Sequence, residues 1–393
     1  MPGTWIANIR IPATAALLAA VPAPAAPPAW LPWDSPVETG AALEWTQASD
    51  VRVVAAQLRL APVPEAHGWG ITVSSEHMSI DYTPNPLVDS VGRRLRRTQT
   101  NVSAGLTRDW QVGPRDEINA GARYREGYSD FRAIWIDEYY TQQFSGFAAF
   151  EKASPRAFGA SAGWARELWE GGTRLEVDYA FDHENIAPGY ERIFGPGGGG
   201  LERGRDHLDN HQIRVSAEGL ADARTRLRGD LFAIKVSERD WRFAAQGQAN
   251  WNPLGDWVLR GSAFYAREST RTQDEEDIGT APAADGELWA YGVRAAVEHP
   301  LAASWTGGIS LLFYRDNGQV ENSLFTVTTA APALLTRSAE VYVRYAKGRH
   351  ALRLSLAGRA DRYAAPRSDI APFANLYSDR DWLRVGAAYQ IEW

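Results

Sequence analysis

The final eleven residues of this 393-residue chain place the tightest limit on its fold. From Leu383 to Trp393, apolar residues occupy one parity, while Arg, Gly, Ala, Gln and Glu occupy the other. A period of two predicts a β-strand with one apolar face and one polar or small face. Eleven residues also suit a tilted strand that crosses a bilayer. One such strand is equally compatible with the edge of a soluble β-sandwich, so the decision depends on whether the pattern repeats.

The alternation recurs along most of the chain. Residues 241–251 are a clear case, because Trp241 and Trp251 stand at the two ends of one parity and only small or aromatic residues lie between them. This is the pattern of a membrane-crossing strand with two interfacial anchors. We count about 17 candidate strands. An even number is expected when both ends of a barrel lie on one side, and tracing from the two termini gives a conflict between residues 141 and 210. We therefore predict about 16 strands, with roughly 14 or 18 as alternatives.

With its repeated strands and its aromatic carboxy terminus, the sequence resembles bacterial outer-membrane β-barrel proteins. The resemblance implies an all-β fold, namely a transmembrane, antiparallel, up-and-down β-barrel in the cell outer membrane of a Gram-negative bacterium. It also implies that the barrel-assembly machinery reads Trp393, and that the surface contacts outer-membrane lipid and lipopolysaccharide. It points to the class and to no particular family within it.

Connection lengths support this interpretation, because short and long connections alternate over the C-terminal half. Short periplasmic turns and long outer loops are typical of transmembrane barrels, and a soluble sandwich has no reason to alternate so regularly. The expected short connections are 220–224, 252–256, 299–304 and 347–350, and the long ones are 268–286, 316–337 and 361–381.

Three further segments bear on the strand count. We expect residues 127–140 to form an aromatic loop, residues 144–151 to form a strand, and residues 183–209 to form the longest break in the middle of the chain. The break contains Gly195–Gly200, a glycine-rich run that does not hold regular structure cheaply.

Composition excludes several classes of protein. The chain has no Cys, which rules out disulfide scaffolds, thiolate metal sites and thiol nucleophiles. Aromatic residues make up 11% of the chain, with 16 Trp, yet the mean hydropathy is −0.36. That combination does not fit a helical membrane protein, and it suits a barrel with aromatic girdles and a wet interior. The net charge of −7 and the lack of a Lys/Arg-rich arm give no support for nucleic-acid binding.

The amino terminus has the features of an export signal. Arg10 supplies a weak positive region, residues 11–21 are apolar, and Ala23–Ala25 resembles a cleavage site. Several interior prolines argue against a membrane helix here. We expect residues 1–25 to be a signal peptide, 26–36 a Pro/Ala-rich leader and 37–393 the barrel. A disordered Ala/Pro leader is the alternative.

The polar parity of most strands carries charge, and in a closed barrel this parity faces the lumen. A charge on the lipid side would cost about 2–4 kcal/mol at mid-depth. The sequence-based candidates for pore-lining residues are Arg214, Arg226, Arg228, Asp230, Arg242, Arg260, Arg294, Arg344 and Arg353.

These residues favour a pore for passive or weakly selective diffusion of small polar or anionic solutes, since barrels of about 16 strands usually leave an aqueous channel. No cofactor is expected, and the sequence leaves the oligomeric state open. Three alternatives remain at this point: a salt-bridge lattice that only fills the interior, a non-conducting receptor or anchor that works through long loops, and an outer-membrane enzyme.

The best candidate for enzyme or metal chemistry is the acidic and histidine-rich set at residues 182–184, 206–207 and 209–211. No H-E-x-x-H motif is present and no spacing is diagnostic of metal ligands. No G-x-S-x-G motif occurs either. We interpret this set as surface loop residues and predict that the protein is not an enzyme and holds no metal.

Overall fold

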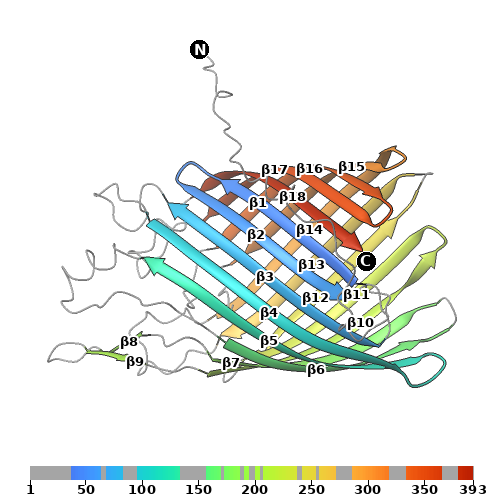
Figure 1. Cartoon of the computed structure of the whole chain (residues 1–393), viewed down its shortest axis with the longest axis horizontal. Coiled ribbons are helices and arrows are strands. Elements are labelled where there is room, and N and C mark those ends of the chain that lie inside the picture. The colour runs from blue at the N-terminus through green and yellow to red at the C-terminus, as the bar shows by residue number, and fades with distance from the viewer. Residues whose placement is uncertain are drawn as a thin grey trace, which may run out of the picture.

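Sixteen antiparallel strands close into one barrel in the computed structural model (Figure 1). The structure describes residues 37–62, 68–82, 95–132, 156–169, 172–185, 190–193, 200–203, 207–236, 241–253, 256–270, 286–317, 333–364 and 379–392. Within these ranges, no helix is long and apolar enough to cross a membrane. The predicted signal peptide and leader, residues 1–36, lie outside the described residues.

The barrel strands follow one another around the wall in chain order, apart from a two-stranded hairpin, β8–β9, that lies outside the closed sheet. Their bounds are β1 Val37–Gln47, β2 Val51–Pro62, β3 Trp69–Tyr82, β4 Leu95–Gln111, β5 Asp116–Arg132, β6 Arg156–Glu167, β7 Arg174–Asn185, β8 Tyr190–Ile193, β9 Gly200–Arg203, β10 His207–Asp222, β11 Thr225–Val236, β12 Arg242–Trp251, β13 Val258–Thr270, β14 Gly286–Ala302, β15 Trp305–Asp316, β16 Leu334–Lys347, β17 His350–Tyr363 and β18 Arg380–Glu392.

The last strand closes the barrel. β18 pairs with β17 on one side and with β1 on the other, in an antiparallel register that runs from Glu38 opposite Glu392 to Gln47 opposite Leu383. Closure gives every strand of the barrel a neighbour on both sides and so removes the unpaired edges of an open sheet. The alternating segment at the end of the chain is therefore the closing strand, and Trp393 itself lies outside the described residues.

The two ends of the barrel have different connections. At one end, here called the short-turn end, neighbouring strands are joined by turns as tight as residues 223–224, 303–304 and 348–349. Gly348 has a φ of 58°, a left-handed conformation that glycine adopts without steric cost. The opposite end, the long-loop end, joins β13 to β14, β15 to β16 and β17 to β18 by longer connections, as predicted, although residues 48–50 make a short turn there.

A side chain also shapes the turn between β10 and β11. Asp222 accepts a hydrogen bond from the backbone N–H of Arg224 at 2.7 Å and one from the Thr225 hydroxyl at 2.9 Å. These two bonds stabilise the carboxylate and hold the pKa of Asp222 below its usual value. Such Asp side-chain bonds to the backbone two residues on are typical of turns.

The structure confirms the predicted strand number and corrects some strand ends. β5 continues to Arg132, so the first part of the predicted aromatic loop at 127–140 is strand. β5 then pairs directly with β6, which leaves no place between them in the sheet for a strand at 144–151, a range outside the described residues. This direct pairing resolves the parity conflict. The predicted break at 183–209 is narrower, because β7 reaches Asn185 and β10 begins at His207.

Candidate functional site

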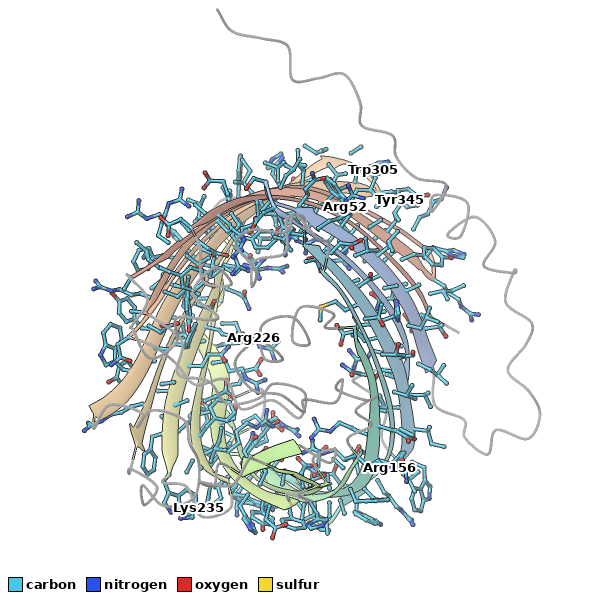
Figure 2. The ribbon with its side chains drawn as sticks, turned by 90° about the vertical axis from the view of Figure 1, so that its left-hand side faces the viewer. Arg52, Arg156, Arg226, Lys235, Trp305 and Tyr345 are labelled. Atoms are coloured by element: carbon cyan, nitrogen blue, oxygen red, sulfur yellow. The ribbon has the colours of Figure 1, made fainter. Side chains whose placement is uncertain are left out.

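The outer face of the barrel is apolar, as the strand parity predicts. Large side chains such as Leu231, Leu311 and Val341 point away from the interior and are at least half exposed. Exposed apolar surface on this scale marks a contact with lipid or a partner. Trp305 and Tyr345 lie outside the wall, whereas Arg226 extends inward (Figure 2).

Aromatic residues concentrate near both ends of this outer face. Their rings contact one another or neighbouring histidines, as in Trp305 with Tyr345 and Trp257 with His299 near the short-turn end. Trp289 with Tyr291, and Trp241 with Phe243, are the counterparts near the long-loop end. An apolar band between two aromatic girdles is the arrangement of a lipid-facing barrel surface.

The inner face carries ion pairs. On β5–β11, which we call the paired wall, each described inward-facing arginine lies against one or more carboxylates. Arg214 lies 2.6 Å from Asp178, and Arg228 lies 3.0 Å from Asp230. The other pairs on this wall are Arg123 with Asp182, Arg125 with Asp182, Arg174 with Glu117 and Glu176, Arg214 with Glu176, Arg226 with Glu218 and Arg228 with Glu218.

Across the barrel, β13–β18 carry a second group centred on Glu340 in the middle of β16. Three arginines from three different strands surround its carboxylate, Arg294 at 3.5 Å, Arg353 at 3.2 Å and Arg384 at 3.4 Å. The Ser310 hydroxyl donates a further hydrogen bond to it at 3.2 Å. Opposite charges attract at these distances, so one carboxylate holds three long side chains together.

The group continues toward the short-turn end. Arg260 lies 2.9 Å from Glu298, and the Tyr342 hydroxyl donates a 2.5 Å hydrogen bond to the same carboxylate. Arg353 stacks on the Tyr342 ring, with its guanidinium carbon 4.0 Å from the ring centroid. We call Glu298, Glu340, Tyr342 and the arginines that contact them the Glu340 cluster.

Glycines on the inner face allow side chains to make contact across an intervening strand. Gly308 of β15 lies in register between Glu298 of β14 and Tyr342 of β16. A Cβ atom at Gly308 would overlap the Tyr342 ring, so only glycine lets this ring cross to Glu298. Gly159 of β6 plays the same part between Arg123 and Asp182.

Carboxylates and guanidiniums occupy different depths on the inner face. The Glu340 side chain is 7% exposed, whereas those of Arg294, Arg353 and Arg384 are 51%, 40% and 36% exposed. On the paired wall, Asp230 is 5% exposed and Arg228 is 30% exposed. The most recessed acids are Asp182 and Asp230 on the paired wall and Glu298 and Glu340 in the Glu340 cluster, and guanidinium groups cover them on the side of the enclosed space. Asp178 and Glu218 are nearly as exposed as Arg214 and Arg228, which contact them.

Comparisons with known proteins give matches among solved structures alone. No family model and no curated protein matches the sequence. Among solved structures, CdiB from Acinetobacter baumannii matches with a TM-score of 0.50 and 10% identity, over 91% of this chain and 60% of that one. A bacterial polysaccharide outer membrane secretin has a TM-score of 0.46 and 9% identity, over 91% and 98% of the chains. The Pseudomonas putida toluene transporter TodX has 0.41 and 12%, over 92% and 89%.

The closed sheet, its apolar band and its two girdles decide the class. The protein is an outer-membrane β-barrel. At these identities the likeness to solved structures concerns the fold alone, so the function of this outer-membrane β-barrel has to be argued from its own residues.

The sequence-predicted residues of the outer-membrane β-barrel divide into three sets. Arg214, Arg226, Arg228 and Asp230 come together on the paired wall. Arg260, Arg294 and Arg353 belong to the Glu340 cluster, and Arg344 lies beside it, opposite Arg353 in the register. Arg242 is placed by its backbone alone, at the start of β12 opposite Glu268.

Sequence reasoning identified the inward parity but not its internal contacts. The roles of Tyr342 and Gly308 were missed, because a tyrosine on a polar parity and a glycine on the next strand carry no signal until the register is known. Glu340 lies on the polar parity of its strand, but the sequence gives no indication that it would gather three arginines.

The histidine-rich set expected on a surface loop lies partly in strands. His183 of β7 and His211 of β10 face outward near the long-loop end, where His183 lies 2.7 Å from Asp209 and His211 lies 2.7 Å from the Tyr179 hydroxyl. Asp182 faces inward, so neighbours in sequence are split between the two faces. Among the described residues, no group of three acids or histidines could hold a metal ion.

Proposed function

We propose that this outer-membrane β-barrel is a passive pore for small anionic solutes. The observation that carries the proposal is the layering of charge on the inner face, where exposed guanidiniums cover recessed carboxylates. An ion in the enclosed water approaches the outer layer first, and the interaction between charges falls with distance. Chloride, phosphate and small carboxylates therefore meet attraction, and small cations meet repulsion.

The same ion pairs also fit an interior that is merely filled by a salt-bridge lattice. Two features favour a pore. First, each arginine of these pairs binds a carboxylate on its own side of the barrel. The ion pairs named above do not cross the interior from the paired wall to the Glu340 cluster. Second, barrels of about 16 strands usually enclose more space than wall side chains fill.

Arg344 is the best probe of this proposal. It faces inward on β16 and is exposed, and no carboxylate among the described residues lies within ion-pair distance of it. Its cross-strand neighbour is Arg353, another cation. Replacing Arg344 therefore changes the charge of the inner face without breaking an ion pair.

We expect Arg344→Glu to lower the anion-to-cation permeability ratio two- to threefold. At about 10 Å in water, two unit charges interact by about 0.4 kcal/mol, and screening at 0.1 M salt reduces this to about a third. The substitution changes the charge by two units and acts oppositely on anions and cations. The measurement is the reversal potential of single channels in planar bilayers under a potassium chloride gradient.

Lys235→Glu is the matched control, since Lys235 lies on the outer side of the wall (Figure 2) and the charge change is the same. We expect it to leave the permeability ratio unchanged. A protein that inserts but gives no conductance steps would overturn the pore and favour a receptor or anchor. Steps with equal ratios for Arg344→Glu and the parent would remove Arg344 from the ion path.

A further inference from the structure

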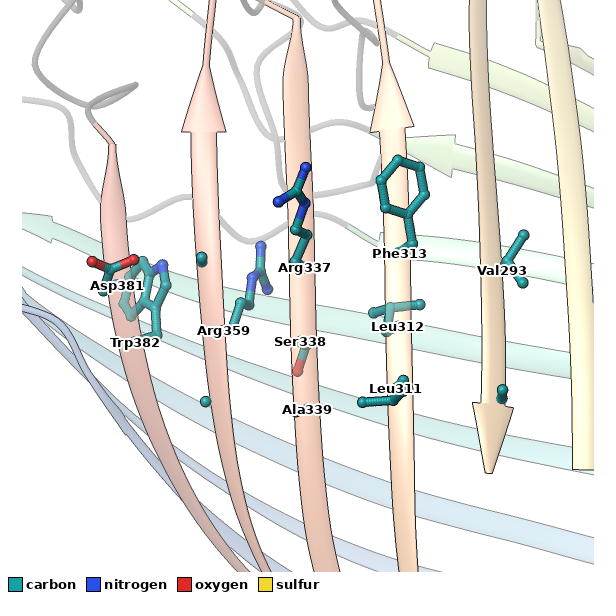
Figure 3. A pocket seen from close by; sticks show the side chains of 13 residues that line it. Val293, Leu311, Leu312, Phe313, Arg337, Ser338, Ala339, Arg359, Asp381 and Trp382 are labelled. Carbon is teal, nitrogen blue, oxygen red and sulfur yellow. The ribbon is translucent and has the colours of Figure 1, made fainter. Parts of the chain in front are cut away.

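The outer face carries a groove over β14–β18, toward the long-loop end (Figure 3). Its volume is about 710 Å³, which is within the range of ligand pockets. Small residues form the floor, namely Ala339, Gly358 and Ala360, and the larger Leu311 and Phe313 form one side. A Cβ atom at Gly358 would meet nothing within 4 Å, so the groove is open above this position.

Two arginines lie at the upper end of this groove, on the outer face. Arg337 lines it directly, and Arg315 is on the neighbouring strand. Arg337 is opposite Phe313 and Arg315 is opposite Leu335, so the two arginines are diagonal neighbours across the strand pair. Diagonal neighbours have Cα atoms about 7–8 Å apart, which lets two long side chains converge on one group.

Neither arginine is neutralised by the described part of the chain. Arg315 lies over the Trp289 ring, 5.9 Å from its centroid, and no described carboxylate lies within ion-pair distance of Arg315 or Arg337. The carboxylate at the far side of the groove is Asp381, and Arg362 already binds it at 2.6 Å. Among the described residues, the same face thus has two adjacent cations with no carboxylate at ion-pair distance.

The depth of Arg315 and Arg337 in the membrane indicates which counter-ion they can meet. Trp289, Tyr291 and Phe313 belong to the girdle of the long-loop end, so Arg315 and Arg337 lie where lipid headgroups meet acyl chains. A cation costs about 2–4 kcal/mol at the centre of the bilayer and much less at this level, where its charged end reaches polar groups. A lipid headgroup is a counter-ion that the membrane supplies at this level.

We propose that this groove is a binding site for a phosphate-bearing outer-leaflet lipid. The phosphate binds between Arg315 and Arg337, and one acyl chain lies along Leu311, Ala339 and Gly358. Guanidinium groups bind phosphate oxygens by paired, charge-assisted hydrogen bonds, which a neutral headgroup cannot accept in the same way. An apolar groove that begins at two cations matches the chemistry of an anionic headgroup joined to a hydrocarbon chain.

The test uses the full-length protein in detergent micelles and native mass spectrometry. The probes are phosphatidic acid, diacylglycerol with the same acyl chains, and inorganic phosphate. We expect phosphatidic acid to be retained about tenfold more strongly than diacylglycerol, because two charge-assisted contacts separate them. The double variant Arg315→Gln/Arg337→Gln should lose that tenfold preference. Inorganic phosphate alone should not be retained, since it lacks the chain.

Two further variants separate a site from general charge. Arg52→Gln removes another outward-facing cation of the long-loop end, on β2, and should leave retention unchanged. Gly358→Leu fills the groove and should weaken both lipids by a similar factor. Equal retention of phosphatidic acid and diacylglycerol, equal losses in Arg52→Gln and the double variant, or no effect of Gly358→Leu would each overturn the proposal. Dimers that form through this face in place of lipid retention would also overturn it.

Each variant is first checked for folding by the gel-mobility difference between heated and unheated samples. A variant without a folded band is replaced by a milder form, the single change Arg337→Gln in place of the double variant or Gly358→Val in place of Gly358→Leu. The lipid proposal does not depend on the pore proposal, because one concerns the outer face and the other the inner face.

Discussion

Inward-facing glycines decide which polar contacts can span more than one strand gap. Gly308 lets Tyr342 reach Glu298, and Gly159 lets Arg123 reach Asp182. Each contact therefore joins strands that are not hydrogen-bonded to each other. At the scale of residues, the absence of a side chain is as important to the inner face as the arginines are.

We expect Gly308→Val to lower the free energy of unfolding by about 1–3 kcal/mol. The valine side chain would displace the Tyr342 ring and break its hydrogen bond to the recessed Glu298 carboxylate, and a bond to a charged group is worth about 1.5–3 kcal/mol. The measurement is urea unfolding of the protein in lipid vesicles.

Gly229→Val is the control for that substitution. Gly229 faces outward, and a Cβ atom there would meet nothing within 4 Å, so the variant should be as stable as the parent. Wild-type stability of Gly308→Val would mean that Tyr342 keeps Glu298 by another path, and the role assigned to Gly308 would be wrong.

At the scale of elements, the pairing of β18 with β1 joins the last strand of the chain to the first and closes the barrel. Besides the backbone register, Arg380 at the start of β18 binds Asp50, in the turn after β1, at 2.8 Å and 3.0 Å. The Arg380 side chain is only 5% exposed. This ion pair connects segments 330 residues apart in sequence and ties the last strand to the first hairpin.

We expect Arg380→Gln and Asp50→Asn each to destabilise the barrel by about 1–3 kcal/mol. Each change breaks the contact between Arg380 and Asp50, and breaking a recessed ion pair from one side is costly. The double variant should lose less than the sum of the two, because both act on one contact. Additive losses in the unfolding measurement would show that the pair contributes nothing beyond its separate residues.

Strands could be predicted wherever lipid constrains them. β12, with Trp241 before it and Trp251 at its end, and β18 alternate because one face must be apolar. The end of β5 was missed because this part of the strand lacks such an apolar face. From Gly127 to Arg132 the strand continues by pairing with β4, yet its two faces carry no apolar alternation.

Contacts between strands were harder to predict than the strands. The parity of a single strand shows that Arg294, Arg353 and Arg384 face inward, but the meeting of all three at Glu340 depends on the register of five strands. A one-residue change in any of these registers would separate them. The sequence therefore predicted which side chains lie on the inner face, but not which of them contact one another.

At the scale of the whole molecule, the apolar band determines how the barrel sits in the membrane. Leu227 and Leu231 face outward on the same strand, β11, with Leu227 near the short-turn end and Leu231 near the middle. The depth of a position should set the cost of placing a charge there.

We expect Leu231→Arg to destabilise the protein by about 2–4 kcal/mol and Leu227→Arg by about 0–1 kcal/mol, since the penalty falls toward the interface. Both variants add the same charge to the same face of one strand. Unfolding from lipid vesicles is the measurement. Equal penalties would contradict the assigned level of the membrane.

Because the most recessed acids lie behind guanidinium groups, the net charge of the whole protein differs in sign from the charge nearest the enclosed space at these places. A formal count of −7 describes an acidic protein, and electrophoresis or ion exchange reports that total. In the proposed pore, a solute beside the paired wall or the Glu340 cluster meets guanidinium groups first, and their charge has the opposite sign. In the proposed pore the two properties are uncoupled, because charge changes in the loops would alter the net charge of the protein and leave the charges of the inner face as they are.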